Sequence, residues 1–331
     1  MRFGTFLPHG WRLDLDGIPA AEQWPRIRDI AERLDDSPEW EGAWVYDHFH
    51  SAPFVEDADV HEAWSLVSAL SAVTTRLRLG QMCTCMGYRK PIYLAKLAAT
   101  ADVISGGRVE MGIGAGWYEH EWRAYGYGFP SAGERIGMLD EGVQIMRQAW
   151  HTGTASLEGK HFQVEDARCH PLPLQPGGIP LWIAGGGEKK TLRVAAQYAD
   201  YTNFDGTPEG FKHKSEVLAA HCDNVGREFT EITRSANYNV LIAETEADLA
   251  EREAWLRDKY TRLVGEEGAE AQLRSFVGMP GYGTPEQIVE KLTAMSDLGL
   301  DYAITYFPDL GEYAESLELF EKAVIPELQR A

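Results

Sequence analysis

Short apolar runs alternate with longer amphipathic runs along almost the whole chain. The short runs predict buried strands, and the longer runs, with apolar residues three or four apart, predict helices that cover them. Strands are predicted at residues 2–7, 42–47, 77–82, 108–113, 180–185, 200–204, 236–244 and 301–307. Helices are predicted near 20–34, 59–73, 91–105, 133–151, 188–198, 208–225, 245–296 and 314–326, the seventh stretch holding more than one helix.

Eight strand–helix units follow one another without a linker of low complexity, which favours an α/β fold with a closed (β/α)8 TIM barrel over an open doubly wound sheet. A single domain is expected over residues 1–331. The stretch from about 151 to 180 breaks the rhythm and predicts a β-hairpin with a proline-rich crossing, inserted before strand five. This insertion and the irregular region at about 260–285 are expected to form lids or interfaces and to choose the substrate.

The composition of the chain limits the kinds of molecule that it is expected to bind. The net charge of −20 argues against nucleic acid, which is bound through surplus Lys and Arg, but leaves room for a small anionic cofactor in a local pocket. The N-terminal run lacks the apolar core of a signal peptide, and no run reaches the roughly 18 apolar residues of a membrane span, so we expect a cytoplasmic protein without membrane association. The four cysteines do not form a disulfide framework, and Cys83-x-Cys85 lacks the second ligand pair of a zinc site.

The stretch "GGRVEMGIGAGW" (106–117) raises the question of a nucleotide-binding loop. Three strands precede it, the spacing is GxGxG, and no acidic strand end follows about 20 residues later, so a Rossmann fingerprint is disfavoured. A tight barrel turn and a cofactor loop both remain. In a barrel this loop lies on the C-terminal face, together with the polar strand ends "VYDHFH", "QMCTCMGYRKP", "IAGGGEKK" and "TNFDG", where active sites of this fold are built.

The segments "AWVYDHF", "LRLGQMCTCMGYRKPIYLAKLAATADVISGGRVEMGIGAGWYEHEWRAYG" and "IPLWIAGGGEKKTLRVAAQYAD" closely resemble the luciferase-like monooxygenase superfamily, in particular its coenzyme F420-dependent oxidoreductase branch. The resemblance runs from Phe3 to about Asp205 and includes the C-terminal "GTPEQIVEKLTAMSDLGLDYAITYF". It implies an F420-dependent oxidoreductase that transfers a hydride between the deazaflavin and a small organic substrate, in a homodimer. Two alternatives stay open: an FMN-dependent monooxygenase of the same superfamily, and a metal-dependent barrel hydrolase using His48 and His50. Against the hydrolase, later strand ends lack the further ligands it needs.

The resemblance also implies roles for residues at two strand ends. Asp47 and His48 would lie against the deazaflavin ring, where the imidazole hydrogen-bonds a ring oxygen or relays a proton and the carboxylate fixes its tautomer. Packing of His48 in the barrel mouth is the simpler alternative. Met82, Cys83 and Thr84 would form a bulge with a non-prolyl cis peptide against the ring, or else an ordinary strand end.

After strand four, Gly114, Ala115 and Gly116 would approach the ribityl or phosphate part of the cofactor, walled in by Trp117 and Tyr118. The branch that oxidises sugar phosphates carries a glutamate proton donor at the position of Trp117, so that activity is not expected. The neighbouring Glu119, His120 and Glu121 offer an acid, although an exposed helix start accounts for them better.

The last predicted contacts lie at strands five, one, six and eight. Ala184, Gly185, Gly186 and Gly187 precede a helix expected from Glu188, a strand–glycine–helix start that suits a phosphate, with charge from Lys189 and Lys190. The substrate side of the mouth is predicted to hold Phe6, His9, Asn203, Tyr306 and Phe307, although the aromatic ones suit packing equally well.

Overall fold

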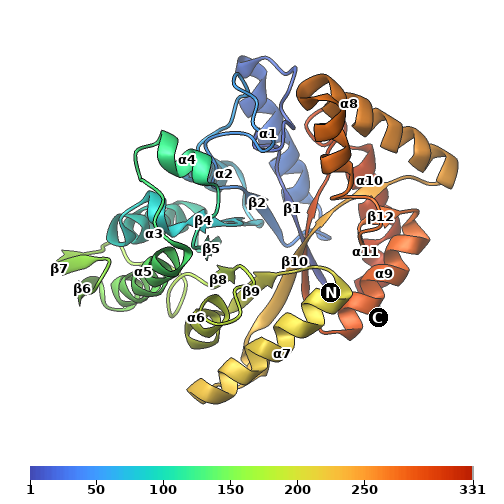
Figure 1. The fold of residues 1–331 in the computed structure, drawn as a ribbon. Helices are drawn as coiled ribbons and strands as arrows, with labels where there is room; N and C mark the ends of the chain where they lie inside the picture. The colour runs from blue at the N-terminus through green and yellow to red at the C-terminus, as the bar shows by residue number, and fades with distance from the viewer. Residues whose placement is uncertain (330–331) are drawn as a thin grey trace.

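The computed structural model describes residues 1–329, and eight parallel strands form a closed barrel at its centre (Figure 1). The barrel strands are β1 (Arg2–Phe6), β2 (Gly42–Val45), β3 (Arg78–Gln81), β5 (Val109–Gly114), β8 (Leu181–Ala184), β9 (Tyr201–Phe204), β10 (Thr233–Asn239) and β13 (Tyr302–Tyr306). Pairing of β1 with β13 and of β3 with β5 closes the ring. The predicted (β/α)8 barrel is therefore confirmed.

Helices surround the ring on all sides (Figure 1). They are α1 (Ala20–Asp36), α2 (Ala63–Val73), α3 (Pro91–Ser105), α4 (Glu119–Ala124), α5 (Ala132–Thr152), α6 (Thr191–Tyr198), α7 (Pro208–Val225), α8 (Glu246–Leu273), α9 (Pro285–Asp297), α10 (Glu315–Ala323) and α11 (Ile325–Gln329). Two helices begin later than predicted, α2 at Ala63 instead of 59 and α6 at Thr191 instead of Glu188. The strand predicted from 236 begins at Thr233, and the helix predicted near 314–326 is divided into α10 and α11. The short helix α4 was anticipated only as a helix start at Glu119 to Glu121, without an end. None of the helices within residues 1–329 is long and apolar enough to cross a membrane.

Large aromatic side chains fill the barrel interior. Trp44 and Trp182 meet edge to face with ring centroids 4.7 Å apart, and the indole of Trp182 donates a hydrogen bond of 2.7 Å to the Glu110 carboxylate. A Cβ at Gly4 would lie 2.5 Å from the Trp44 indole nitrogen, and one at Gly80 would lie 2.6 Å from the same ring. Glycine at these two strand positions therefore makes the space that Trp44 occupies.

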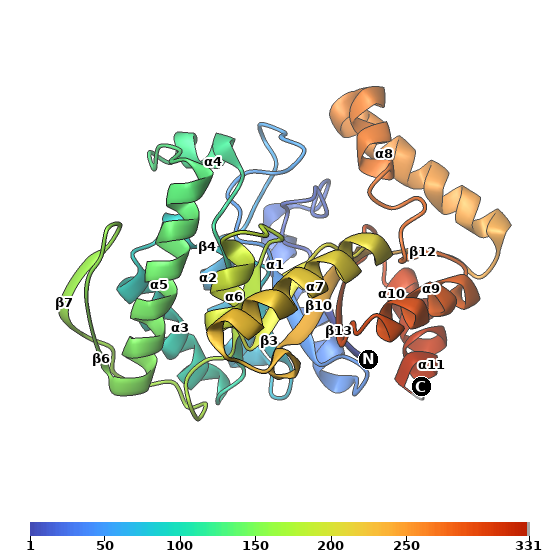
Figure 2. The ribbon, with the colours of Figure 1, turned by 60° about the horizontal axis from the view of Figure 1, so that its bottom comes forward.

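The insertion before β8 is a hairpin, as predicted, but it is not a lid. Its strands β6 (Thr154–Glu158) and β7 (Gln163–Arg168) pair antiparallel and lie on the outer side of α5 (Figures 1 and 2). The Glu141 carboxylate on α5 accepts hydrogen bonds from the backbone N–H groups of Lys160, His161 and Phe162. This contact fastens the hairpin to the helix side of the barrel.

The C-terminal ends of the barrel strands form the mouth, with α4 and α8 rising at that end and both termini at the other (Figure 2). The region 260–285 does reach the mouth. There α8 bends at Gly265, whose φ of 75° and ψ of 173° interrupt the helix. A two-stranded ribbon of β11 (Leu241–Ile242) and β12 (Tyr282–Gly283) then joins this region to the end of β10.

Candidate active site

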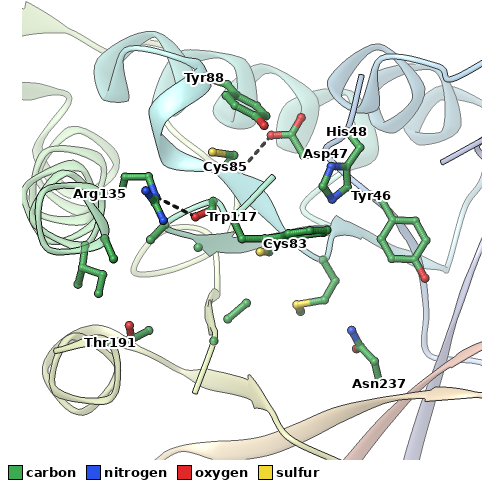
Figure 3. A pocket seen from close by; sticks show the side chains of 18 of the residues that line it. Tyr46, Asp47, His48, Cys83, Cys85, Tyr88, Trp117, Arg135, Thr191 and Asn237 are labelled. Atoms are coloured by element: carbon green, nitrogen blue, oxygen red, sulfur yellow. Dashed lines mark hydrogen bonds between the residues drawn. The ribbon is translucent and has the colours of Figure 1, made fainter. Parts of the chain in front are cut away.

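A cavity of about 380 Å³ opens at the mouth of the barrel (Figure 3). Ten of the residues singled out from the sequence line it: Asp47, His48, Met82, Cys83, Gly114, Ala115, Gly116, Trp117, Ala184 and Gly185. The rest of the lining was not predicted: Trp11, Tyr46, Cys85, Tyr88, Ala132, Arg135, Ile136, Thr191 and Asn237. The cavity thus joins strand ends and loops that lie far apart in the sequence.

A bulge after β3 forms part of the wall. The strand pairs with β5 at Leu79 and Gly80, and pairing resumes at β4 (Thr84–Cys85) after the intervening residues. The peptide bond between Met82 and Cys83 is cis, as the resemblance implied. Burial, with a smaller contribution from the Asp47 carboxylate, raises the pKa of the Cys83 thiol to about 12. The thiol is therefore protonated near neutral pH and is no nucleophile.

The His48 ring is held on two sides. It stacks on Trp11 with centroids 4.3 Å apart and planes 5° from parallel, and its Nδ1 lies 2.8 Å from Glu121 Oε2. The sequence interpretation assigned the tautomer-fixing carboxylate to Asp47, whereas the structure has Glu121 in that position. Since Nδ1 is engaged by Glu121, Nε2 is the nitrogen left to face the cavity.

Glu121 lies in the first turn of α4, as predicted, but it is fully buried, so the predicted exposure is wrong for this carboxylate. Besides His48, it accepts hydrogen bonds from the backbone N–H groups of Phe49 and His50, at 2.8 and 2.9 Å, and from the Tyr88 hydroxyl at 2.8 Å. Burial alone would raise the pKa of Glu121, but the hydrogen bond and charge of His48 and the two backbone donors hold it below its ordinary value. Glu121 is therefore an ionised acceptor.

Asp47 stabilises the wall of the cavity through its hydrogen bonds. Its carboxylate forms a two-pronged ion pair with Arg89, at 2.7 and 2.9 Å, and accepts a hydrogen bond of 2.8 Å from the Cys85 backbone N–H. Arg89 continues to the Glu62 carboxylate at 2.6 Å. Asp47 therefore ties β2 to the segment after the bulge, instead of acting on the His48 ring.

The opposite end of the cavity is formed by the first turn of α5 and the glycine turn after β8. Arg135, at this end of the cavity in Figure 3, donates to the carbonyl oxygen of Gly116 at 3.1 Å. Its guanidinium also lies over the Phe129 ring. Since α6 begins only at Thr191, a further turn separates Gly185, Gly186 and Gly187 from the helix. A second cavity of about 340 Å³ adjoins this end and shares Ile136 with the first; its other lining residues are Gly137, Asp140, Lys189, Lys190, Arg193 and Val194.

Four residues predicted to bind the cofactor do not line the main cavity. Gly186 and Gly187 lie beyond it, and Thr84 is buried with its hydroxyl 2.6 Å from the Gln81 amide. Tyr118 stacks on Trp117 and donates to the carbonyl oxygen of Ser51 at 2.9 Å. Thr84 and Tyr118 therefore pack against residues that line the cavity or its surroundings and are not themselves exposed to it.

The residues predicted for the substrate side lie outside the cavity. Phe6 stacks on Tyr46 with centroids 4.0 Å apart, and Phe307 packs against Trp40 and Phe320 in the layer between barrel and helices. Tyr306 is buried beneath the Arg12 guanidinium, whose carbon lies 4.2 Å from the ring centroid. His9 is fully buried, and burial lowers the pKa of its imidazole to about 3. Asn203 is also buried, directly behind Asn237, which does face the cavity.

The imidazoles of the hydrolase alternative are bound to protein groups. His50 faces His120 with their Nδ1 atoms 3.0 Å apart, while His48 is bonded to Glu121. Within residues 1–329, no group of three or more His, Cys, Asp or Glu side chains is arranged to hold a metal ion. All four cysteines are free thiols.

Comparison with solved structures supports the barrel assignment. The chain resembles an F420-dependent secondary alcohol dehydrogenase in complex with an F420–acetone adduct, with a TM-score of 0.78, 18% identity and coverage of 99% of this chain and 98% of that one. It also resembles the EDTA monooxygenase EmoA from Chelativorans sp. BNC1, with a TM-score of 0.80, 16% identity and coverage of 100% and 93%. Identities this low establish the common fold alone.

Sequence comparison identifies the family. The pyrimidine monooxygenase RutA of Stutzerimonas stutzeri is 30% identical over 275 residues, covering 81% of this chain and 72% of that one. Alignments with several other enzymes of that name span only 50% to 58% of their lengths. The sequence model described as luciferase-like monooxygenase matches residues 1–302, which displaces the hydrolase alternative. The chain is therefore an oxidoreductase and belongs to the luciferase-like monooxygenase family.

Proposed function

We propose that the chain is an F420-dependent oxidoreductase, which transfers a hydride between the deazaflavin and a small organic substrate in the cavity at the barrel mouth. The observation that carries the proposal is the make-up of this cavity. Small residues, Ala115, Ala184 and Gly185, leave space between the bulge and the glycine turns, His48 stands at one end, and Arg135 stands at the other.

These residues suit a flat ring system with an anionic tail. The cavity volume of about 380 Å³ is within the usual range for small-molecule sites, and its walls are mainly apolar with a few polar groups. Beyond Arg135, the adjoining cavity offers Lys189 and Lys190, together with Arg193, which is ion-paired with Asp140 at 3.8 Å. F420 carries a phosphate and carboxylates on a tail longer than that of FMN, so this succession of cations favours F420 over FMN.

When bound, F420 would supply a two-electron hydride carrier. The chain's own part is to handle the accompanying proton. Because ionised Glu121 can only accept, the Nδ1 of His48 carries a hydrogen, which leaves Nε2 as the ring nitrogen that can gain or lose a proton at the cavity. His48 can therefore take a proton from the substrate at Nε2, or return one in the opposite direction. Trp117, 61% exposed at the mouth, is placed to cover a bound ligand and exclude water.

A second candidate is a flavin-dependent monooxygenase. It is favoured by the pyrimidine monooxygenases among the relatives, which share 28% to 32% identity with this chain. Both functions would use the same cavity, so the cofactor decides between them.

The test is a pair of fluorescence titrations of the purified chain with reduced F420 and reduced FMN. We expect F420 to bind at least ten times more tightly than FMN. Tighter binding of FMN would establish the second candidate, and failure of both to bind below roughly 100 μM would overturn the cofactor assignment altogether.

We also propose that the chain forms a homodimer through α2 and α3. The sequence of α2, AWSLVSALSAV, has no charged residue, and the adjoining α3 exposes Tyr93, Val103 and Ile104. An exposed surface that combines a helix without charge and several apolar side chains is suited to association, which supports a second copy as the cover.

A further inference from the structure

Asn237 is an exposed residue in the middle of a barrel strand. Its neighbours in β10, Ala236 and Tyr238, are buried, and Asn237 lines the active-site cavity. Figure 3 shows its side chain directed into the cavity, on the side where Tyr46 and His48 also lie. The exposed surface of Asn237 is therefore surface that a bound ligand can contact.

A chain of hydrogen bonds fixes which end of the Asn237 amide faces the cavity. The backbone carbonyl oxygen of Thr202 can only accept, so the Ser235 hydroxyl 2.6 Å away must donate its hydrogen there. The Ser235 oxygen is then an acceptor, and the group 3.0 Å from it must be the Asn203 amide nitrogen. The second hydrogen of that nitrogen is directed to Asn237 Oδ1, at 2.9 Å.

Asn237 therefore has its oxygen occupied and its NH2 group free. Among the described residues, no acceptor is bonded to Asn237 Nδ2. Because Asn203 and Ser235 are buried, their side chains and the Asn237 amide cannot rotate without leaving buried donors unpaired, which is unfavourable. The amide is thus held with two hydrogen-bond donors directed into the cavity.

We propose that Asn237 binds a carbonyl oxygen of the substrate. This inference rests on the proposed function only in treating the cavity as the place where substrate and cofactor meet. A fixed NH2 group donates hydrogen bonds, so it favours substrates that present an acceptor atom. It disfavours substrates that present only donors, such as ammonium groups. Across the same end of the cavity, His48 presents Nε2, so the carbonyl is held beside the group that handles protons.

The test uses two probes of nearly equal shape, cyclohexanone and methylenecyclohexane, which differ by an oxygen in place of a CH2 group. Binding to the chain is measured by saturation-transfer NMR, with and without bound F420. One hydrogen bond of ordinary strength corresponds to about tenfold in affinity, so cyclohexanone should bind roughly ten times more tightly than methylenecyclohexane.

Asn237→Asp keeps the acceptor for Asn203 but replaces the free NH2 with an oxygen, so it should abolish the preference for cyclohexanone. Asn237→Ser, smaller and compatible with the strand, should reduce it in the same direction. Asn224→Asp, the same change on the exposed surface of α7, is the control and should keep the preference.

Equal binding of the two probes to the unmodified chain, no binding of cyclohexanone, or an unchanged preference in Asn237→Asp would each overturn the proposal. Failure of the cofactor assignment gives a different pattern. In that case F420 would not bind, while the preference for cyclohexanone in the chain without F420 would remain.

Discussion

Glu119 and Glu121 lie two residues apart on α4, yet one carboxylate is in solvent and the other is fully buried beside His48. The sequence could not separate them, because a helix of six residues is too short to show a periodic apolar face. The nearest signal is Trp122, a large apolar residue next to Glu121 that marks this side of α4 as inward. His48, by contrast, could be identified because it ends an apolar strand on the catalytic face of the barrel.

Glu121→Gln should lower kcat by about 10- to 100-fold while the affinity for F420 stays within about threefold. The amide offers only one acceptor atom, so it cannot fix the Nδ1–H tautomer of His48 and also accept from the neighbouring backbone groups. Steady-state kinetics across pH, together with an F420 titration, measure both effects. Glu119→Gln on the exposed side of α4 is the matched control.

The pH dependence of kcat should change as well, because Glu121→Gln removes an ionised carboxylate 2.8 Å from His48 Nδ1. If kcat falls in Glu121→Gln but its pH profile stays that of the unmodified chain, then Glu121 only supports the fold of the loop.

Glu110 should make the barrel less stable as the pH rises from about 4.5 to about 7. Burial raises its pKa to about 7, partly offset by the Arg78 charge and the Trp182 hydrogen bond, from an ordinary value of 4.5. Below pH 4.5, Glu110 is protonated in both the folded and the unfolded chain. Between pH 4.5 and 7 only the folded chain keeps the proton, so the free energy of unfolding falls as the pH rises. Above pH 7 Glu110 is ionised in both states, and the whole loss of stability remains. The loss is at most about 3 kcal/mol.

Urea unfolding of the unmodified chain and of Glu110→Gln at several pH values tests this. Glu110→Gln also changes the contacts of Arg78, which shifts the unfolding free energy of the variant by a similar amount at each pH. The informative quantity is therefore how the difference in unfolding free energy between the two proteins changes with pH. Glu165→Gln, exposed on the hairpin, should show no such change. A constant difference for Glu110→Gln would contradict the raised pKa.

At the scale of elements, the eight strands could be predicted because each is a compact apolar run, whereas the side chains at their ends were harder to place. Successive residues of a strand point to opposite faces. Tyr306 therefore faces the barrel interior while Phe307 faces the helices, and both could not belong to one substrate site. The same alternation in β9 predicts that Asn203 and its neighbour Phe204 point to opposite faces of the sheet. It does not reveal that Asn237 lies between Asn203 and the cavity, because that depends on the register of β10 against β9.

Gly265→Ala should destabilise the chain by about 1–3 kcal/mol or straighten α8. The φ of 75° and ψ of 173° at this position are open to glycine and strongly disfavoured for alanine. A Cβ there would meet nothing within 4 Å, so the backbone alone accounts for the effect. Thermal unfolding measures the loss, and Glu267→Ala, exposed two residues later, should be close to neutral. Equal midpoints for the two variants would mean that the bend does not depend on glycine.

Ile104→Glu should convert the proposed homodimer to a monomer. Ile104 is 48% exposed on α3, and a buried carboxylate facing its symmetry mate would oppose association. Light scattering after size-exclusion chromatography should give twice the chain mass of 37.0 kDa for the unmodified protein and 37.0 kDa for the variant. Val225→Glu, at an exposed apolar position on α7, should remain dimeric. A monomeric unmodified chain, or a dimeric Ile104→Glu variant, would contradict the proposal.

For the whole molecule, the closed barrel was predictable because it follows from counting strand–helix units. The contributions of the hairpin before β8 and of the loop after β1 were not. The hairpin around 154–168 is fastened to α5 away from the cavity, while the loop after β1 provides Trp11 at the cavity wall. A loop can be recognised from its composition, but the direction in which it leaves the barrel depends on contacts such as those of Glu141, which join residues about 20 positions apart.

The charge distribution of the whole molecule also bears on cofactor binding. The chain has a net charge of −20, so an anionic cofactor is repelled at long range, and binding depends on cations near the cavity. Lys189 and Lys190 are exposed and line the second cavity, of about 340 Å³, which adjoins the Arg135 end of the main cavity. At 0.15 M salt the Debye length is about 8 Å, so these near charges act while the distant acidic surface is largely screened.

The double variant Lys189→Ala/Lys190→Ala should therefore weaken F420 binding by about 5- to 30-fold, since two exposed ion pairs contribute roughly 1–2 kcal/mol together. The deazaflavin fragment without the phosphate-containing tail should bind both proteins equally, because it does not reach the lysines. Fluorescence titrations of both ligands at 0.15 M and 1 M salt provide the measurement, and at 1 M the difference between the two proteins for F420 should nearly vanish, as the Debye length falls to about 3 Å. If the double variant weakens the fragment and F420 alike, the lysines act on the shape of the glycine turn and not on the tail, and the electrostatic argument for F420 over FMN fails with it.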